Sequence, residues 1–423
     1  MTIEPAAHAG TPYRYPIGLF GAFGVEIEHM IVDAETLDVR PIADALFRAV
    51  TGEDVADVEP DGEHGIISWS NELVLHVAEL KTQRPAPSLD GLADHFQDHV
   101  RRINALLASM GARLLPTGMH PWMDPDRETR LWPHENNEIY RAYDRIFGCR
   151  GHGWGNLQST HVNLPFSDDA EFSRLHAACR LVLPLIPALA ASSPYADGVR
   201  APNLDHRLEM YRQNSRRVPS MVGMVVPETV TGRAMFERDV LGCLYAELAA
   251  HDPEGVLRHE FANARGAMAR FDRGAIEIRL IDTQECPAAD LAVVAIVTGA
   301  VRALTEERWL DLAAQQAIAT EPLRDALLRT IRDGERAVIH EPELLRAFGQ
   351  RGAVEAGELW AMLLEAVMPT GSVYVPMLRR MLAAGSLATR LVRALGDAPS
   401  RGAMREVYAE LAQSLDCGEL FRA

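Results

Sequence analysis

Residues 23–33 read Phe23-Gly24-Val25-Glu26-Ile27-Glu28-His29-Met30-Ile31-Val32-Asp33, and polar and apolar side chains alternate along them with a period of two. This alternation predicts a β-strand with one buried face. Val25, Ile27 and Met30–Val32 are expected to supply the apolar side, with Glu26 and Glu28 together on the other. Neighbouring carboxylates repel each other and glutamate is a poor strand former, so we expect a compensating cation. The alternative is the solvated outer face of an antiparallel sheet, which is common.

The composition of the whole chain limits its function. The chain has 423 residues, of which 48% are hydrophobic, and this is enough for a large core and one or two domains. Its formal net charge of −17 argues against nucleic acid or an anionic membrane surface as a partner. Lys81 is the one lysine among 42 basic residues. Because Lys81 does not follow a glycine turn, the sequence contains no P-loop.

Cysteine usage and hydropathy bear on the cellular compartment. The cysteines are scattered and odd in number, which suits a reducing cytosol better than a disulfide framework or a zinc ribbon. The N-terminus lacks the basic start and apolar core of a signal peptide. The longest apolar runs, at 181–191 and 291–300, are too short to span a bilayer. We therefore expect a soluble, cytoplasmic protein without a membrane partner.

Strand-like and helical segments alternate along the chain. Strand character is found at 66–69, 73–80, 112–117, 157–165 and 275–281. From residue 168 onward the chain is predicted to be mostly helical, with an arginine-rich loop at 200–217 and the strand at 275–281. This order predicts an α+β protein in which helices cover one face of a mostly antiparallel sheet.

Three further segments repeat the unusual polar face of the first strand. Their polar residues are Ser159, His161 and Asn163 in the strand at 157–165, Glu277 and Arg279 in the strand at 275–281, and Glu72, His76 and Glu79 in the segment 71–82. Glu72 and Glu79 are seven residues apart, which places them on opposite faces of a regular strand. Either Glu72 precedes the strand or a bulge intervenes.

The clustered carboxylates and histidine fit a site for a hard divalent cation. Mg²⁺ or Mn²⁺ takes carboxylate oxygens, tolerates an imidazole and leaves coordination positions for phosphate oxygens. A soft metal ion would favour cysteine, and none of these segments contains one. Without a metal, clustered carboxylates would raise one another's pKa at a cost in stability.

Each of these residues also has an ordinary structural interpretation. Glu277 and Arg279 suit a cross-strand salt bridge, His161 a hydrogen-bonded core position, and His76 a structural or exposed position. Arginines of the 200–217 loop are expected to form largely a solvated face, although arginine also binds phosphate and carboxylate well; they are Arg200, Arg207, Arg212, Arg216 and Arg217. The joint pattern over four segments favours the metal site.

Four motifs taken together resemble glutamate–cysteine ligase family 2, a group of carboxylate–amine ligases. They are Gly24-Val25-Glu26-Ile27-Glu28, the acidic segment from Glu72 to Thr82, Gln158-Ser159-Thr160-His161-Val162-Asn163, and Gly274-Ala275-Ile276-Glu277-Ile278-Arg279-Leu280-Ile281-Asp282. The resemblance implies a glutamine-synthetase-like fold whose curved antiparallel sheet holds ATP and Mg²⁺ (or Mn²⁺). Residues 18–310 would form the catalytic domain, and residues 311–423 a C-terminal helical region packed on it.

The resemblance also implies roles for single residues. Arg279 would contact the transferring phosphate of ATP and act in catalysis together with Glu277. The implied metal ligands are Glu26, Glu28, Glu72, Glu79, His161 and Glu277.

The implied reaction is ATP-dependent amide formation through an acyl phosphate. We expect glutamate as the acid and consider cysteine as the amine, so that the partners are small molecules; assembly into a homo-oligomer is left open. A metal-dependent hydrolase using the same carboxylates and a non-catalytic relative of the family are the alternatives.

Overall fold

The computed structural model describes residues 14–422, and its centre is an eight-stranded antiparallel sheet. The strand order is β2-β3-β4-β1-β6-β10-β9, and β5 pairs with the second half of β1. The strands are β1 (Gly24–Asp33), β2 (Asp57–Val58), β3 (Ile67–Asn71), β4 (Val77–Thr82), β5 (Ala112–Leu115), β6 (Ser159–Pro165), β9 (Ala267–Arg270) and β10 (Ala275–Asp282). The predicted first strand therefore lies in the middle of the sheet.

The two faces of β1 contact different surroundings. Val25, Ile27 and Ile31 are fully buried in the main core. Met30 and Val32 belong instead to a second, smaller apolar cluster that includes Trp122 and Tyr408. The prediction that Met30 and Val32 share a face with Val25 is wrong, because the period of two continues to the end of the strand and reverses their direction.

Two strand predictions need correction. The segment 73–80 is not one strand, because β4 begins at Val77 and the preceding residues form the connection from β3. The short strand β9 was not predicted, because polar and apolar side chains hardly alternate along its four residues. It pairs with β10 at the edge of the sheet. Strands β5, β6 and β10 lie where the sequence predicts them.

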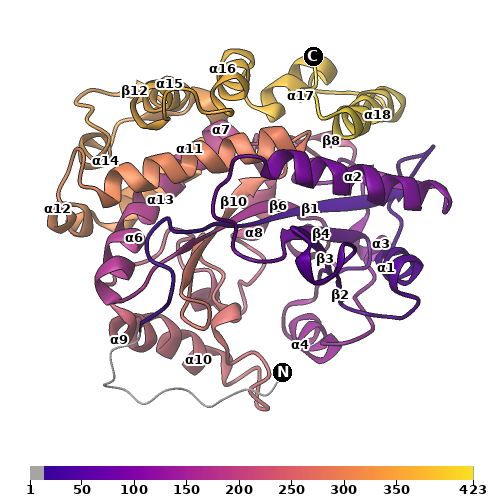
Figure 1. Ribbon diagram of the computed structural model, residues 1–423, viewed down its shortest axis with the longest axis horizontal. Coiled ribbons are helices and arrows are strands. Elements are labelled where there is room, and N and C mark those ends of the chain that lie inside the picture. Colours follow the sequence, from indigo (N-terminus) through magenta and orange to yellow (C-terminus); the bar gives the residue numbers. More distant parts are fainter. Residues whose placement is uncertain (1–13, 423) are drawn as a thin grey trace.

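One face of the sheet is covered by helices α2 (Leu92–Ala108), α6 (Asp169–Val182), α7 (Ile186–Ala190) and α11 (Pro287–Thr305), as Figure 1 shows for α2 and α11. Helix α11 is buried along nearly its whole length and contacts both α2 and α6. Helices α15 (Ala356–Val367) and α16 (Val375–Ala384) pack on α11 as an outer layer, whereas α17 (Leu387–Leu395) and α18 (Arg401–Cys417) pack together near β5, against Met30 and Val32. Helix α18 also contacts α2 and β5. The sheet is thus backed by two layers of helices.

Shorter elements lie on the other side or at the rim of the sheet, where Figure 1 shows α4, α9 and α10. They are α1 (Ala43–Thr51), α3 (Pro125–Glu128), α4 (Asn137–Phe147), α5 (His152–Gly155), α8 (His206–Tyr211), α9 (Arg233–Phe236) and α10 (Gly242–Leu248). Two small hairpins, β7–β8 (Tyr195–Ala196, Val199–Arg200) and β11–β12 (Val338–Ile339, Val354–Glu355), and the helices α12 (Leu312–Ala317), α13 (Thr320–Asp333) and α14 (Pro342–Ala347) complete the α-helices and strands of the described residues.

Two helical stretches are long and apolar enough to cross a membrane by length and composition. They are Asp169–Ala190 and Pro287–Thr305, and both exceed the apolar runs seen in the sequence. Their most hydrophobic windows are 94% and 83% buried inside the protein. They are therefore the central helices of this core.

The main buried cluster extends continuously from β1 to Leu415 on α18. It includes Ile27 of the sheet, Val297 of α11 and Trp360 of α15. The C-terminal helices therefore share the core of the sheet. The division of the chain at residue 310 stays a prediction.

Candidate active site

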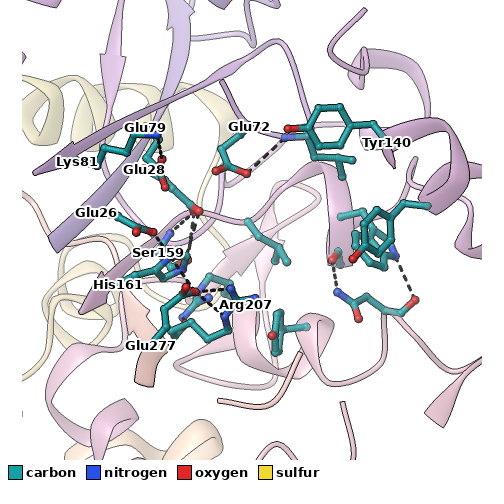
Figure 2. A pocket seen from close by; sticks show the side chains of 18 of the residues that line it. Glu26, Glu28, Glu72, Glu79, Lys81, Tyr140, Ser159, His161, Arg207 and Glu277 are labelled. Atoms are coloured by element: carbon teal, nitrogen blue, oxygen red, sulfur yellow. Dashed lines mark hydrogen bonds and ion pairs between the residues drawn. The ribbon is translucent and has the colours of Figure 1, made fainter. Parts of the chain in front are cut away.

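The register of the sheet gathers the predicted polar residues on the face that lines the cavity, opposite the main core. Glu26 of β1 is paired with Lys81 of β4 on one side and with His161 of β6 on the other. Glu28 is paired with Glu79. Directly opposed residues of antiparallel strands point to the same face, so these side chains lie next to one another. Figure 2 shows them at the floor of a cavity.

His161 lies at the centre of this group. Its Nδ1 is 3.1 Å from Glu26 Oε2 and 3.7 Å from Glu277 Oε1. Its Nε2 is 2.8 Å from Ser159 Oγ and 3.9 Å from Glu28 Oε1. Glu28 also accepts a hydrogen bond of 2.7 Å from the backbone N–H of Ser159. The imidazole on β6 therefore bridges carboxylates of two strands, β1 and β10.

Among the residues that the structure describes, two groups of side chains could each hold a metal ion. One comprises Glu26, His161 and Glu277, and the other comprises Glu28, Glu79 and His161. Within each group the possible ligand atoms all lie within 4.8 Å of one another. Carboxylate oxygens with a single imidazole are a donor set that suits Mg²⁺ or Mn²⁺. The residues present therefore fit the hard cations that the sequence suggested.

The electrostatics of the floor also fit a cation. Burial raises the pKa of Glu79 well above its usual range, and the charges of Glu26 and Glu72 add to this. Burial, together with the charges of Glu28 and Glu26, raises the pKa of Glu72 to about 8. A bound divalent cation would stabilise the ionised form of these carboxylates and so lower their pKa values.

Glu26 behaves in the opposite way. Burial favours its neutral form, but the hydrogen bond and the charge of His161 outweigh burial and hold the pKa of Glu26 at about 2. The pKa of His161 is raised: burial opposes this, and the hydrogen bond to Glu26 and the charges of Glu28 and Glu277 outweigh it. Without a bound cation the two residues thus form an ion pair within the floor, and a cation that takes His161 as a ligand would replace the proton of the ring.

Arginines border the carboxylates on β9 and β10. Arg279 hydrogen-bonds to Glu277 through Nε at 3.1 Å and through its Nη2. Arg270 of β9 lies 3.8 Å from the same carboxylate and pairs with Asp272. Arg273 also lines the cavity. The floor therefore presents carboxylates beside guanidinium groups, which suit anionic phosphate or carboxylate ligands.

A bulge in β10 brings one more acid to this region. The register against β6 shifts between Ile278 and Ile281, so that β10 gains one residue. Asp282 then pairs with Ser159 instead of facing the opposite side. Its carboxylate is buried and forms an ion pair with Arg207 of α8. This pair fixes Arg207 against the cavity.

The cavity above the floor has a volume of about 370 Å³. Away from the carboxylates, its wall consists of aromatic residues from α4, α5 and α8: Tyr140, Tyr143, Trp154 and Tyr211. In Figure 2, Glu72 lies between the carboxylates of β1 and Tyr140. The site therefore combines a charged floor and an aromatic wall.

The model of glutamate-cysteine ligase family 2 (GCS2) matches residues 22–410. The chain belongs to this family. The match includes the strands of the floor and most of the C-terminal helices, so it extends well beyond the segment 18–310 on which the resemblance rested.

Relatives of this family member differ in how much of their length is matched. An uncharacterized protein of Archaeoglobus fulgidus is 35% identical over 69% of this chain and 77% of its own length. A protein of Cupriavidus metallidurans named "Putative glutamate–cysteine ligase 2" is 29% identical over 47% of each chain. The match to this named relative therefore spans about half of its length.

A solved structure with a similar fold is the glutamate–cysteine ligase of Francisella tularensis in complex with AMP. It is 11% identical, and the superposition covers 95% of this chain and 90% of that one with a TM-score of 0.55. At this identity the likeness concerns the fold alone. The predicted α+β fold of the glutamine-synthetase-like type is confirmed.

The structure places the predicted site residues in two sets. Glu26, Glu28, Glu79, His161 and Glu277 come together on the floor, with Arg279 beside them. Glu72 lines the same cavity but belongs to neither of the two groups that could hold a metal ion. Because it lies in the connection after β3, the first of the two explanations for its odd spacing is correct.

Two other residues had been given ordinary structural interpretations from the sequence, and the structure bears out the one for His76. His76 is fully buried and its Nε2 lies 2.7 Å from the Gly155 carbonyl oxygen, so it is structural. Arg207 was expected on a solvated face, but it is 1% exposed and lines the cavity. Its spacing from Tyr211, four residues on one helix, is a signal that could have suggested a shared face. The aromatic wall was missed because its residues come from three separate helices.

Proposed function

We propose that this protein is an ATP-dependent carboxylate–amine ligase that uses Mg²⁺ or Mn²⁺. The observation that carries the proposal is the pair of carboxylate groups sharing His161, next to the guanidinium groups of Arg270 and Arg279. Such a floor can bind divalent cations and anionic phosphates side by side. Membership of the family and the ligase names of its relatives support the same chemistry.

In the proposed reaction, a carboxylate oxygen of the acid attacks the γ-phosphorus of ATP and ADP leaves. The amine nitrogen then attacks the acyl carbon of the resulting acyl phosphate, loses a proton and displaces inorganic phosphate. We infer glutamate as the acid and consider cysteine as one candidate amine. The reaction needs no covalent bond to the protein.

The residues of the floor divide this work between them. Glu26 and Glu277 would hold one cation, and Glu28 and Glu79 the other; neutral His161 has one free ring nitrogen, which it would give to one of the two. The cations would neutralise charge on the phosphoryl oxygens and orient them for in-line transfer. Arg279, kept in place by Glu277, would contact the transferring phosphate with a group that is always charged. In this arrangement the side chains of the floor bind and orient the phosphate, and none of them acts as a nucleophile activated by a neighbouring base.

Phosphate release is the first assay. ATP, Mg²⁺ and glutamate are held constant while a panel of amines that includes cysteine is varied, and products are identified by mass. Amine-dependent release with the matching amide mass supports a ligase. If phosphate release is the same with every amine, other acids are tested in place of glutamate. Hydrolysis of an amide substrate without ATP would favour a metal-dependent hydrolase instead.

Two amide variants test the floor directly. Glu28→Gln and Glu277→Gln keep the size of the side chain and remove its charge, so we expect loss of ATP turnover with an unchanged circular dichroism spectrum. Glu35→Gln is the matched control, because Glu35 is exposed just beyond the end of β1. Activity retained in both floor variants would refute the metal-site assignment.

A further inference from the structure

The aromatic wall of the cavity offers ring faces and few free polar groups. Tyr140 accepts a hydrogen bond of 2.9 Å from Asn71 Nδ2. Trp154 donates its indole N–H to the Asn214 carbonyl oxygen at 3.1 Å, and Tyr211 donates its hydroxyl to the Ala264 carbonyl oxygen at 2.7 Å. Three of the four aromatic polar groups are thus already engaged, and their rings remain to contact a ligand.

The wall is also rigid. Trp154 stacks on Phe147 with a centroid distance of 5.4 Å and lies 5.2 Å from Tyr143. The glycines on either side of Trp154 leave no room for side chains. A Cβ at Gly153 would lie 2.7 Å from Asn214 Cβ, and a Cβ at Gly155 would overlap Thr129 Oγ1. The two ring contacts and the hydrogen bond to the Asn214 carbonyl oxygen hold the indole in place, which lowers the entropic cost of binding.

A cation stands beside this wall. Arg207 and Tyr211 are four residues apart on α8, so they share one face of the helix, and both line the cavity. Arg207 is 1% exposed, and its ion pair with Asp282 fixes the guanidinium. A buried guanidinium next to aromatic faces suits a molecule that carries a carboxylate close to a broad apolar group.

From this arrangement we infer that the aromatic end of the cavity binds the amine substrate, and that this amine is an amino acid with an aromatic or broad apolar side chain. Its carboxylate contacts Arg207, and its side chain packs against Trp154 and Tyr143. Its amino group then points toward the carboxylate floor, where the acyl phosphate forms. The inference rests on the proposed ligase function, and it makes cysteine a poorer acceptor than phenylalanine, because a thiol covers little of the wall.

Isothermal calorimetry tests the subsite without requiring turnover. Phenylalanine, tyrosine, leucine, lysine and cysteine are titrated into the full-length protein with Mg²⁺ and a non-hydrolysable ATP analogue. We expect phenylalanine or tyrosine to bind about tenfold more tightly than cysteine. Equal or tighter binding of cysteine, or a preference for lysine, would overturn the inference.

Variants locate the binding site. Trp154→Leu should weaken phenylalanine binding about tenfold while changing cysteine binding little. Trp309→Leu is the matched control, because Trp309 packs against Phe348 away from the cavity. Tyr143→Leu provides a second test should Trp154→Leu fail to fold. Unchanged phenylalanine binding in a folded variant of either position would refute the subsite.

The two proposals can fail separately. If phenylalanine binds as expected but no acid supports ATP-dependent phosphate release, the subsite stands and the ligase proposal fails. If a ligase reaction is found whose best amine is cysteine, the ligase proposal stands and the aromatic subsite fails.

Discussion

His161 on β6 and Glu26 on β1 form a hydrogen bond of 3.1 Å between Nδ1 and Oε2. His161 is also a member of both groups of side chains that could hold a metal ion. The other ring nitrogen faces Ser159 and Glu28. A single imidazole therefore connects the two halves of the carboxylate floor. Its loss should affect both cation sites together.

His161→Gln should lower ATP turnover by at least about 100-fold and weaken Mn²⁺ binding, because both groups lose a shared member. Phosphate release and the electron paramagnetic resonance signal of free Mn²⁺ measure the two effects. His340→Gln is the control, since the His340 side chain is 59% exposed at the surface. Mn²⁺ binding of wild-type strength in His161→Gln would exclude a ligand role for this histidine.

Divalent cations should stabilise the folded protein, because they neutralise carboxylates that crowd one another at Glu79 and Glu72. A site present only in the folded state adds about 2.7 kcal/mol when the cation is at one hundred times its Kd. Thermal unfolding with and without Mn²⁺ measures the gain. The double variant Glu28→Gln/Glu79→Gln should lose the part of this gain that comes from the group containing Glu79. An equal gain in this variant would place the bound cation elsewhere.

Asp282→Asn should destabilise the protein by about 3 kcal/mol, because it leaves the guanidinium of Arg207 buried without its counter-ion. Urea unfolding at pH 7 measures this. Adding Arg207→Met should recover part of the lost stability, since the unpaired charge is then gone, but it should not recover activity. If Asp282→Asn is as stable as wild type, the ion pair does not hold α8 in place.

Titration of His176 should lower the stability between pH 7 and pH 5, whereas the raised pKa values of Glu72 and Glu79 act in the opposite direction. Burial lowers the pKa of His176 to about 3 from its usual 6.5, so the unfolded chain takes up a proton first as the pH falls. The stability that neutral His176 contributes is fully present above pH 6.5. It is lost as the pH falls from 6.5 toward the pKa of about 3 in the folded protein, and at pH 5 the loss is about 2 kcal/mol.

The variant His176→Leu removes this titration and keeps an apolar group beside Phe172. Between pH 7 and pH 5, its free energy of unfolding in urea should shift by about 2 kcal/mol in the stabilising direction relative to that of wild type. Parallel pH dependences in the two proteins would show that His176 does not titrate as its burial indicates.

The sequence by itself determined which side chains share a face. Side chains along a strand alternate locally, so Glu26 with Glu28 and Glu277 with Arg279 could be grouped without knowing the strand order. The donor types then indicated a hard cation, and four motifs in order indicated the family. The α+β class followed from the alternation of segments.

Tertiary structure alone decided how these faces meet. Pairing of β1 with β6 and β4 is a long-range choice, and only this register places His161 between Glu26 and Glu28. The bulge in β10, the partner of Arg207 and the aromatic wall depend on contacts between residues far apart in the chain. Local propensity reports the direction of a side chain, whereas its neighbours are selected by the burial of the whole core, and a short window of sequence does not contain that information.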